Sequence, residues 1–362
     1  MLHQNPLQSD LDTSTRFITA GEIMLRLTPP NYEKIRMASS FEASYGGSEA
    51  NIALALANLG IDSTFFSVVP NNSLGKSAVR WLRSNDVHCT PVILSTPEQT
   101  PTHRLGSYYL ETGYGIRASQ VIYDRKHSAI SEFDFSQVDL DALLSDFDWL
   151  HLSGITPALS PSCAQLILDL LRVAHEKGLT VSFDGNFRSS LWTWEQARDF
   201  CTQCLPYVDV LFGIEPYHLW KDDGDRSKGD WKDGVPLQPD YEQQDEIFHH
   251  FVEKYPNISC IARHVRYAHS GSENSLKAFM YFEGHTFESR LFTFTILDRV
   301  GGGDAFASGL IYAMMKHYKP MDILNFAVAS SALKHTIHGD ANITDNAETI
   351  RNLMNMSYDI RR

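Results

Sequence analysis

The chain has 362 residues, 43% of them hydrophobic, and a formal net charge of −13 with a pI near 5.5. This is the composition of a globular protein with a large core, and its acidity argues against a nucleic-acid partner because phosphates would be repelled. No stretch approaches the ~20 apolar residues of a membrane span. The five scattered cysteines indicate no disulfide framework, and with no signal peptide recognised we expect a cytoplasmic protein.

Strands and helices alternate along most of the chain. Residues 1–16 are predicted to be a flexible tail, and one domain is expected over 17–362. The repetition of strand, helix and strand predicts an α/β fold with helices on both faces of a doubly wound sheet, whose ligands gather beyond the carboxyl ends of the strands. Extended segments are predicted at 17–21, 23–27, 63–69, 149–152, 179–183 and 208–212, and helices at 46–60, 78–82, 164–175 and 194–205.

Three segments depart from this alternation. Residues 29–45 and 102–128 mix polar and apolar side chains without a helical period, and we expect them to be short strands of a small sheet that covers the site as a lid. Residues 221–246 are polar, mostly acidic and contain several glycines and prolines. They are predicted to be a solvated surface insertion.

The strongest chemical signal is the run from Asp298 to Gly309. Gly301, Gly302 and Gly303 precede Asp304 and an apolar helix. Glycines allow successive backbone amides to point at one anion, and a helix N-terminus adds unpaired amides and partial positive charge. Asp304 would then take the proton of an attacking alcohol, which favours phosphoryl transfer to a hydroxyl. The alternative is a tight turn with Asp304 as the helix N-cap.

A second glycine turn opens the helix at 46–60. A small polyhydroxy ligand could lie against the backbone of Gly47 and bond the amide of Asn51, although a plain helix start uses the same residues. Tyr123 and Arg125 alternate in an extended segment and so share one face, and Tyr109, one hairpin earlier, is expected to share it too. A ring beside a guanidinium suits a ligand with a carbon skeleton and a carboxylate; exposed sheet residues are the alternative.

Asn186 and Arg188 follow the predicted strand at 179–183. This places both at the carboxyl end of a strand, where an arginine is costly to hold unless an anion lies nearby. The sequence supports a binding role and a structural role for them about equally.

With these residues, the chain resembles the ribokinase-like (PfkB) sugar kinases over nearly its whole length, and within them the 2-keto-3-deoxygluconate kinases. The general marks are the Gly-Gly-x-x-x-Asn turn at 46–51 and the Asp-x-x-Gly-x-Gly-Asp stretch at 298–304. The subfamily marks are Gly21-Glu22-Ile23-Met24, Tyr123-x-Arg125-x-x-Ser128-Ala129, the run 152–160, Asp184-x-Asn186-x-Arg188 and Gly339-Asp340.

The resemblance implies a three-layer α/β/α sandwich with a β lid, homo-oligomers built through that lid, and ATP-dependent phosphorylation of 2-keto-3-deoxygluconate at its 6-hydroxyl. It implies that Asp304 is the base, that the amides of 301–303 form the anion hole, and that Asn186 approaches the ATP phosphates. The residues it implies around the sugar acid are Gly47, Tyr109, Tyr123, Arg125, Arg188 and Asp340, with Arg125 and Arg188 as partners of the carboxylate. Asn51 is added to this site from the glycine turn described above.

Two regions depart from the family pattern. Where the family has Asn-x-x-Glu, only Glu215 could help to place Mg²⁺, and the nucleotide loop offers Arg263 and Ser270 without a clean match. A kinase of a neutral sugar such as fructose or ribose, and a non-catalytic sugar-acid sensor, are the alternatives. A dinucleotide dehydrogenase is disfavoured because the glycine run is C-terminal and lacks the following strand with a ribose-binding acid. The sequence does not separate the gluconate from the galactonate epimer of the substrate.

Overall fold

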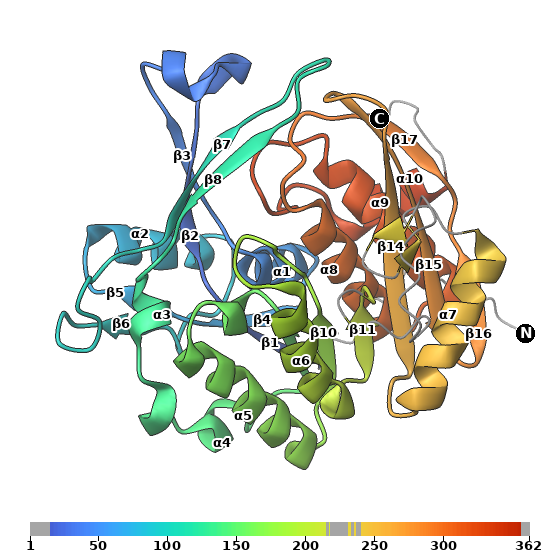
Figure 1. Ribbon diagram of the computed structural model, residues 1–362, viewed down its shortest axis with the longest axis horizontal. Helices are drawn as coiled ribbons and strands as arrows, with labels where there is room; N and C mark the ends of the chain where they lie inside the picture. Colours follow the sequence, from blue (N-terminus) through green and yellow to red (C-terminus); the bar gives the residue numbers. More distant parts are fainter. Residues whose placement is uncertain (1–14, 215–216, 218–230, 233–234, 237–239, 356–362) are drawn as a thin grey trace, which may run out of the picture.

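A nine-stranded sheet forms the centre of the structure (Figure 1), a computed structural model that describes residues 15–214, 217, 231–232, 235–236 and 240–355. Six neighbouring strands are parallel, so their carboxyl ends meet at one edge, and β15, β16 and β17 extend the sheet in antiparallel hairpins. The order is β16 (His285–Glu288), β15 (Glu273–Phe282), β14 (Cys260–Ala268), β11 (Val210–Phe212), β10 (Thr180–Asp184), β9 (Trp149–Ser153), β1 (Arg16–Ala20) and β4 (Asp62–Phe66), with β17 (Phe292–Thr295) beside β15.

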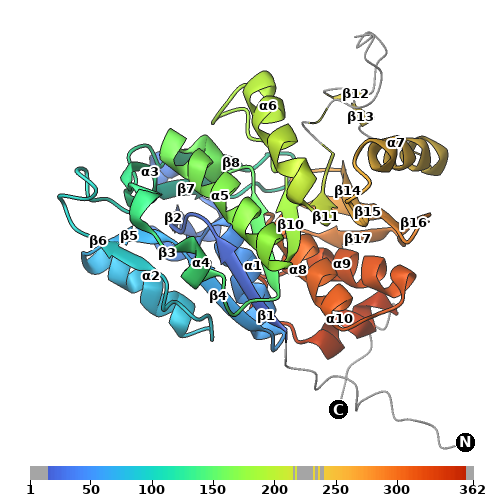
Figure 2. The same cartoon turned by 90° about the horizontal axis from the view of Figure 1, so that it is seen from below.

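Helices cover both faces of this sheet, and its central strands are therefore buried on both sides (Figure 2). Along β1, Ile18 and Ala20 join the core on one face and Phe17 joins the core on the other. The first face packs against α5 (Pro161–Lys177), α6 (Trp194–Cys204) and α7 (Tyr241–Lys254), and the second against α1 (Ser48–Asn58), α8 (Gly302–Met315), α9 (Pro320–Lys334) and α10 (Ala347–Met354). The predicted α/β/α sandwich is confirmed.

The remaining elements lie around the sandwich. They are α2 (Ser73–Arg83), α3 (Ala129–Glu132), α4 (Leu140–Leu143), the pair β5 (Val68–Pro70) and β6 (Ile93–Ser95), and the pair β12 (Trp231–Lys232) and β13 (Val235–Pro236). Helix α2 begins five residues before the predicted start, because the Asn72 side chain caps it by accepting from the amides of Leu74 and Gly75. Among the described helices, none is long and apolar enough to cross a bilayer.

A second sheet of four strands, called the small sheet below, rises from the sandwich (Figure 1). Its order is β3 (Glu42–Gly46), β2 (Met24–Thr28), β7 (Ser107–Glu111) and β8 (Gln120–Asp124). It lies where the sequence analysis predicts the lid. Of the segment 29–45, which was predicted to form strands, only the end from Glu42 does so. Two 3₁₀ turns, Pro30–Tyr32 and Ile35–Met37, occupy it, because two prolines withhold backbone donors and Asn31 takes a left-handed φ of 54°.

The predicted insertion at 221–246 is shorter at its C-terminal end than expected. Most of it lies outside the described residues, but 241–246 belong to α7. Asp240 and Gln243 form a reciprocal capping box there, and Gln244, Ile247 and Phe248 are buried. Of the predicted tail, residues 1–14 are outside the described part of the chain, and Arg16 already starts β1.

The tip of the small sheet meets a turn of the central sheet. The amide of Gly271, in the turn between β14 and β15, donates to the carbonyl of Gly115 (2.6 Å), and the amide of Gly115 donates to Ser272 Oγ (2.7 Å). A Cβ on Gly271 would lie 2.2 Å from the carbonyl oxygen of Arg117, so this contact requires glycine. The two hairpin tips therefore touch across the top of the structure (Figure 1).

Replacing Gly271 with alanine should part the two tips without unfolding the protein. The Gly115 amide should exchange with solvent at least ~10-fold faster, because its bond to Ser272 is lost, while the unfolding free energy changes by less than about 1 kcal/mol. Hydrogen exchange of residues 113–117 measures this. His285→Ala is the control, since it truncates an exposed side chain beside the neighbouring β15–β16 turn. Unchanged exchange at Gly115 in Gly271→Ala would contradict the contact.

Candidate active site

The amino ends of two helices open into one cleft of about 570 Å³. The cleft lies beyond the ends of β10 and β11 and beside β14, with the small sheet as its other wall. Of the residues singled out from the sequence, it is lined by Gly47, Asn51, Tyr123, Arg125, Asn186, Arg188, Arg263, Gly301, Gly302, Gly303, Asp304 and Asp340.

The glycine run forms the N-terminus of α8. Gly301 is the N-cap with a left-handed φ of 80°, and a Cβ there would lie 1.7 Å from the carbonyl oxygen of Asp340. Only glycine fits this position. The first amides of a helix have no partner inside it, and they carry the positive end of its dipole. The amides of 301–303 thus present unpaired donors and partial positive charge to the cleft, an arrangement suited to an anion.

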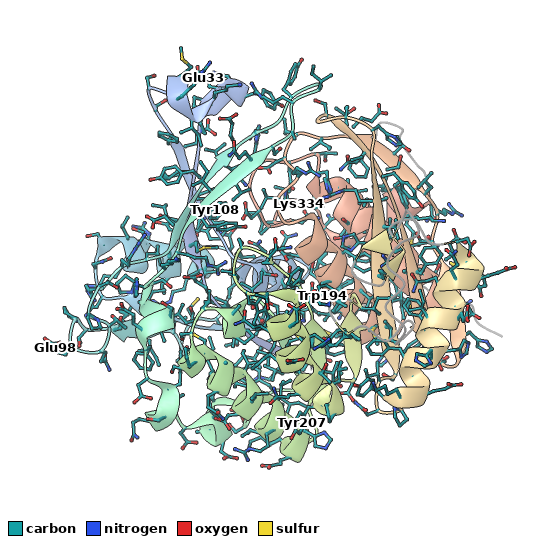
Figure 3. All side chains as sticks on the ribbon, viewed as in Figure 1. Glu33, Glu98, Tyr108, Trp194, Tyr207 and Lys334 are labelled. Carbon is teal, nitrogen blue, oxygen red and sulfur yellow. The ribbon has the colours of Figure 1, made fainter. Side chains whose placement is uncertain are left out.

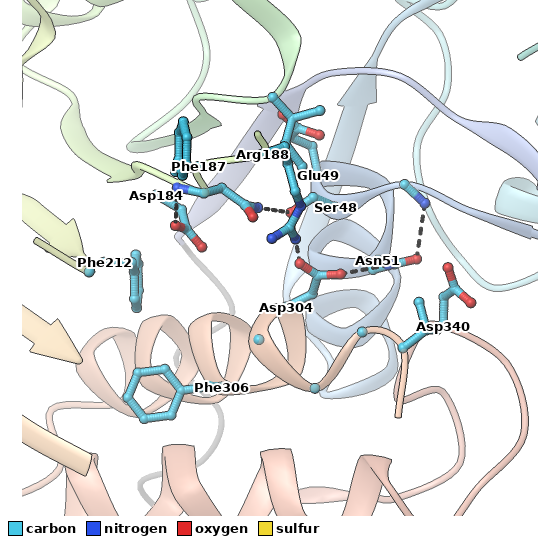
Figure 4. A pocket seen from close by; sticks show the side chains of 18 of the residues that line it. Ser48, Glu49, Asn51, Asp184, Phe187, Arg188, Phe212, Asp304, Phe306 and Asp340 are labelled. Carbon is cyan, nitrogen blue, oxygen red and sulfur yellow. Dashed lines mark hydrogen bonds between the residues drawn. The ribbon is translucent and has the colours of Figure 1, made fainter. Parts of the chain in front are cut away.

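Asp304 is buried between α8 and the start of α1 (Figure 4). Its Oδ1 accepts from Ser48 Oγ and its Oδ2 from Asn51 Nδ2, both at 2.7 Å. Burial raises the pKa of the Asp304 carboxyl, while these two hydrogen bonds and the nearby positive charge of Arg188 lower it. The carboxylate is thus oriented and has an elevated proton affinity, as a general base requires.

Asn51 has protein partners of its own in the cleft. Its side-chain nitrogen donates to Asp304 and its Oδ1 accepts from the Gly47 amide (3.4 Å), so this amide orients the Asp304 carboxylate. Ser48, which the sequence analysis missed, acts in the same way from the adjacent turn of α1. A serine directly after two glycines at a helix start was the available signal.

Asn186 joins the same hydrogen-bonded chain. It has a left-handed φ of 38°, its backbone amide donates to Asp184 Oδ1 (2.8 Å), and its Nδ2 donates to Ser48 Oγ (3.0 Å). Such strained backbone conformations persist where the surroundings enforce them, often at functional sites. Asn186 lines the cleft, but its amide supports Ser48 and through it Asp304.

Three arginines face one another in the cleft. Burial lowers the pKa of Arg266, and the positive charges of Arg299 and Arg188 lower it further. Like charges held together in a partly desolvated cleft are unfavourable unless an anion compensates them. Arg263 lines the same part and donates to Gln244 Oε1 (3.0 Å). This half of the cleft is suited to the phosphates of a nucleotide.

One of the expected nucleotide residues, Ser270, does not line the cleft. Ser270 lies at the tip of the β14–β15 hairpin and accepts from the Ser272 amide (3.1 Å), because the two strands are long enough to carry it away from the cleft. Glu215 lies outside the described residues. Within the described residues, no group of three or more His, Cys, Asp or Glu could form a metal cage.

The register of the small sheet corrects one predicted residue. Tyr108, not Tyr109, pairs directly with Tyr123 across β7 and β8, with ring centroids 5.7 Å apart, and lines the cleft. Tyr109 pairs with Ile122 and packs on Phe41 on the opposite face (5.9 Å), because adjacent residues of a strand point to opposite sides.

Arg125 lies beside Tyr123 as its spacing predicts, with Cζ 5.7 Å from the ring centroid. Its charge is already paired, however, because Nε (2.8 Å) and Nη2 both donate to Oε2 of the buried Glu22. The other oxygen of Glu22, Oε1, is buried without a hydrogen-bond partner among the described residues. This oxygen faces Gly106, where a Cβ would lie 2.7 Å from it.

Comparisons with known proteins agree with this geometry. Residues 14–216 match the model of the pfkB family carbohydrate kinases. The chain is 31% identical to the 2-dehydro-3-deoxygalactonokinase of Haloferax volcanii over 90% of this chain and 93% of the other. It is 36% identical to the crystal structure of a 2-dehydro-3-deoxygluconokinase from Thermotoga maritima, with a TM-score of 0.85 and coverage of 94% and 99%.

A putative ribokinase II from E. coli, solved in complex with ATP and Mg²⁺, shares the fold with a TM-score of 0.74 at 18% identity, over 94% of this chain and 99% of the other. The extent of the family match and the identity over nearly the whole length establish the relationship. The chain belongs to the pfkB family of carbohydrate kinases.

Proposed function

We propose that this protein is an ATP-dependent kinase that phosphorylates the 6-hydroxyl of 2-keto-3-deoxygluconate. The observation that carries the proposal is the Asp304 carboxylate, oriented by Ser48 and Asn51 beside the amides of 301–303 in a cleft that also holds arginines. The names of the relatives, a 2-dehydro-3-deoxygluconokinase and a 2-dehydro-3-deoxygalactonokinase, support a keto-deoxy sugar acid as the substrate.

Each group in the cleft is proposed to have a distinct role in the reaction. Asp304 accepts the proton of the attacking hydroxyl, and the α8 amides stabilise negative charge on the phosphoryl group as it moves. Arg188, which lies near Asp304, is the proposed partner of the substrate carboxylate, because Arg125 is already paired with Glu22. Arg266 and Arg299 face the phosphates of ATP, and Mg²⁺ bound to those phosphates supplies further charge neutralisation.

The small sheet is proposed to act as the lid. Its wall of Tyr108, Tyr123 and Arg125 lines the cleft, and its tip touches the central sheet at Gly271. With both ends in contact, it would exclude bulk water, which would otherwise compete with the sugar as phosphoryl acceptor.

A panel of acceptors tests the substrate. With Mg-ATP, ADP release is expected with 2-keto-3-deoxygluconate and not with gluconate, fructose or ribose; the galactonate epimer of the keto-deoxy acid is included to resolve the C4 preference.

Arg188→Ala should raise the KM for the acid at least ~10-fold with a smaller change for ATP, because a charge-assisted pair to the carboxylate is lost. Arg198→Ala, which removes an exposed arginine of α6 paired with Asp199, is the control. Turnover confined to fructose or ribose would overturn the sugar-acid assignment, and silence with all acceptors would favour a sensor.

The pH dependence tests the role of Asp304. The base must be ionised, so kcat/KM should fall as the pH drops through the pKa of Asp304, which burial raises above that of an ordinary aspartate. Asn51→Ala removes a hydrogen bond that favours the ionised form, and the acidic limb should move to higher pH. Asp304→Asn should reduce kcat by ~100-fold or more at every pH. An unmoved limb in Asn51→Ala, or near-native turnover in Asp304→Asn, would contradict the assignment.

Homo-oligomers formed through the small sheet are also proposed. Its outer parts expose apolar side chains, among them Met37, Tyr114 and Ile116, which are more than 60% accessible. Light scattering of the wild type should give a mass at least twice 40.9 kDa. Ile116→Lys should reduce the mass to that of one chain, because a buried unpaired ammonium opposes association. A monomeric wild type would contradict this proposal without affecting the proposed reaction.

A further inference from the structure

A buried cluster of charges joins the small sheet to the loop that carries the anion hole. Arg26, on β2, is 3% exposed, and its guanidinium donates from Nη2 to Asp298 and from Nη1 to Asp340. Both carboxylates are buried as well, and they come from two different segments of the C-terminal half. The proposed reaction gives Arg26 no role.

Asp298 shapes the turn that enters α8. Its Oδ1 accepts from the Val300 amide and its Oδ2 from the Gly339 amide, both at 3.1 Å. The ammonium of Lys334, from α9, donates to its backbone carbonyl (3.3 Å). The residue held by Arg26 is thus the one that fixes the backbone immediately before Gly301.

Asp340 contacts both halves of the cleft. Its Oδ2 accepts from Tyr108 Oη, which belongs to the wall of the small sheet that faces the proposed sugar site, called the sugar-facing wall. Its backbone carbonyl packs so closely on Gly301 that no side chain would fit at that position. Figure 3 shows Tyr108 on the small sheet and Lys334 on α9, the two elements that the cluster connects. Any shift of Asp340 would therefore move the sugar wall relative to the anion hole.

The choice of arginine follows from this geometry. A guanidinium presents a planar fork that can serve two carboxylates in different directions, whereas an ammonium is a single point charge. Stability alone does not demand such a cluster, because well-packed apolar residues often serve equally well in place of buried ion pairs. The pairs do, however, fix the relative position of three segments: β2, the turn at 298–301 and the loop at 339–340.

We propose that Arg26 is a positioning residue for phosphoryl transfer, which holds the anion-hole turn in register with the sugar-facing wall through Asp298 and Asp340. The inference rests on the proposed kinase function. Its consequence is that the distance between the acceptor hydroxyl and the phosphoryl site depends on Arg26, although Arg26 touches neither substrate.

The first test is Arg26→Lys, which keeps the buried positive charge but cannot maintain both pairs. We expect kcat to fall ~10- to 100-fold, since misplacement of reacting groups costs rate at this scale, while the KM for ATP and for the sugar acid changes less than ~3-fold. Arg104→Lys is the matched control, because Arg104 pairs with Asp124 at the exposed edge of the same sheet. Its kinetics should equal those of the wild type.

The second test is chemical rescue. Arg26→Ala leaves a space between two carboxylates, and added guanidinium ion at non-denaturing concentration should restore kcat at least ~5-fold in this variant and not in the wild type. A merely structural arginine would not give a kcat effect that a small ion reverses at constant KM. If Arg26→Ala does not fold, the Arg26→Lys kinetics decide the matter alone.

The outcomes separate the two proposals. Wild-type kcat in Arg26→Lys, or a parallel loss of nucleotide affinity and folded protein, would overturn the positioning role. If the wild type phosphorylates fructose or ribose instead of the keto-deoxy acid, the substrate assignment fails, and the same Arg26 comparison is made with that sugar.

Discussion

The convergence of two helix N-termini on the Asp304 carboxylate is the constraint on which the site depends. A buried carboxylate loses much of its hydration, and here the loss is offset by the hydroxyl of Ser48, the amide of Asn51 and the positive ends of α1 and α8. To bring the helices this close, α8 must begin on a left-handed glycine at 301 and α1 must begin on Gly47, where a Cβ would lie 2.0 Å from the carbonyl oxygen of Glu22. The two glycine turns and the Asp304 carboxylate therefore form one structural unit.

Much of the fold and part of the site could be predicted from local sequence. A few adjacent residues determine the patterns that predict a helix start at a glycine turn and a buried strand. The same holds for the proximity of Tyr123 and Arg125. The errors came from features that adjacent residues do not determine. Whether Tyr108 or Tyr109 faces the cleft depends on the pairing of β7 with β8, and the position of Ser270 depends on the length of the β14–β15 hairpin. Arg26 carried no local signal, since its partners lie more than 270 residues away.

Charge pairing refines the argument for an acidic substrate. From the sequence, Arg125 and Arg188 were equally good partners for a carboxylate. In the structure, Glu22 neutralises Arg125, whereas the positive charge of Arg188 lies near Asp304 and lowers its pKa. The Glu22–Arg125 pair is buried and its charges neutralise each other, so it is poorly suited to bind a further carboxylate. Of the two arginines, Arg188 is therefore the proposed partner of the substrate carboxylate.

The small sheet is attached very differently at its two ends. At its base, Arg26 and Tyr108 bind buried carboxylates, and separating them would leave uncompensated charge in the interior. At its tip, two hydrogen bonds between half-buried turns hold Gly115 to Gly271 and Ser272, and both groups would be solvated once the tips part. Opening therefore requires far less free energy at the tip than at the base. If the small sheet opens, we therefore expect its tip to part first, while the buried pairs keep Tyr108 in register with the turn before Gly301.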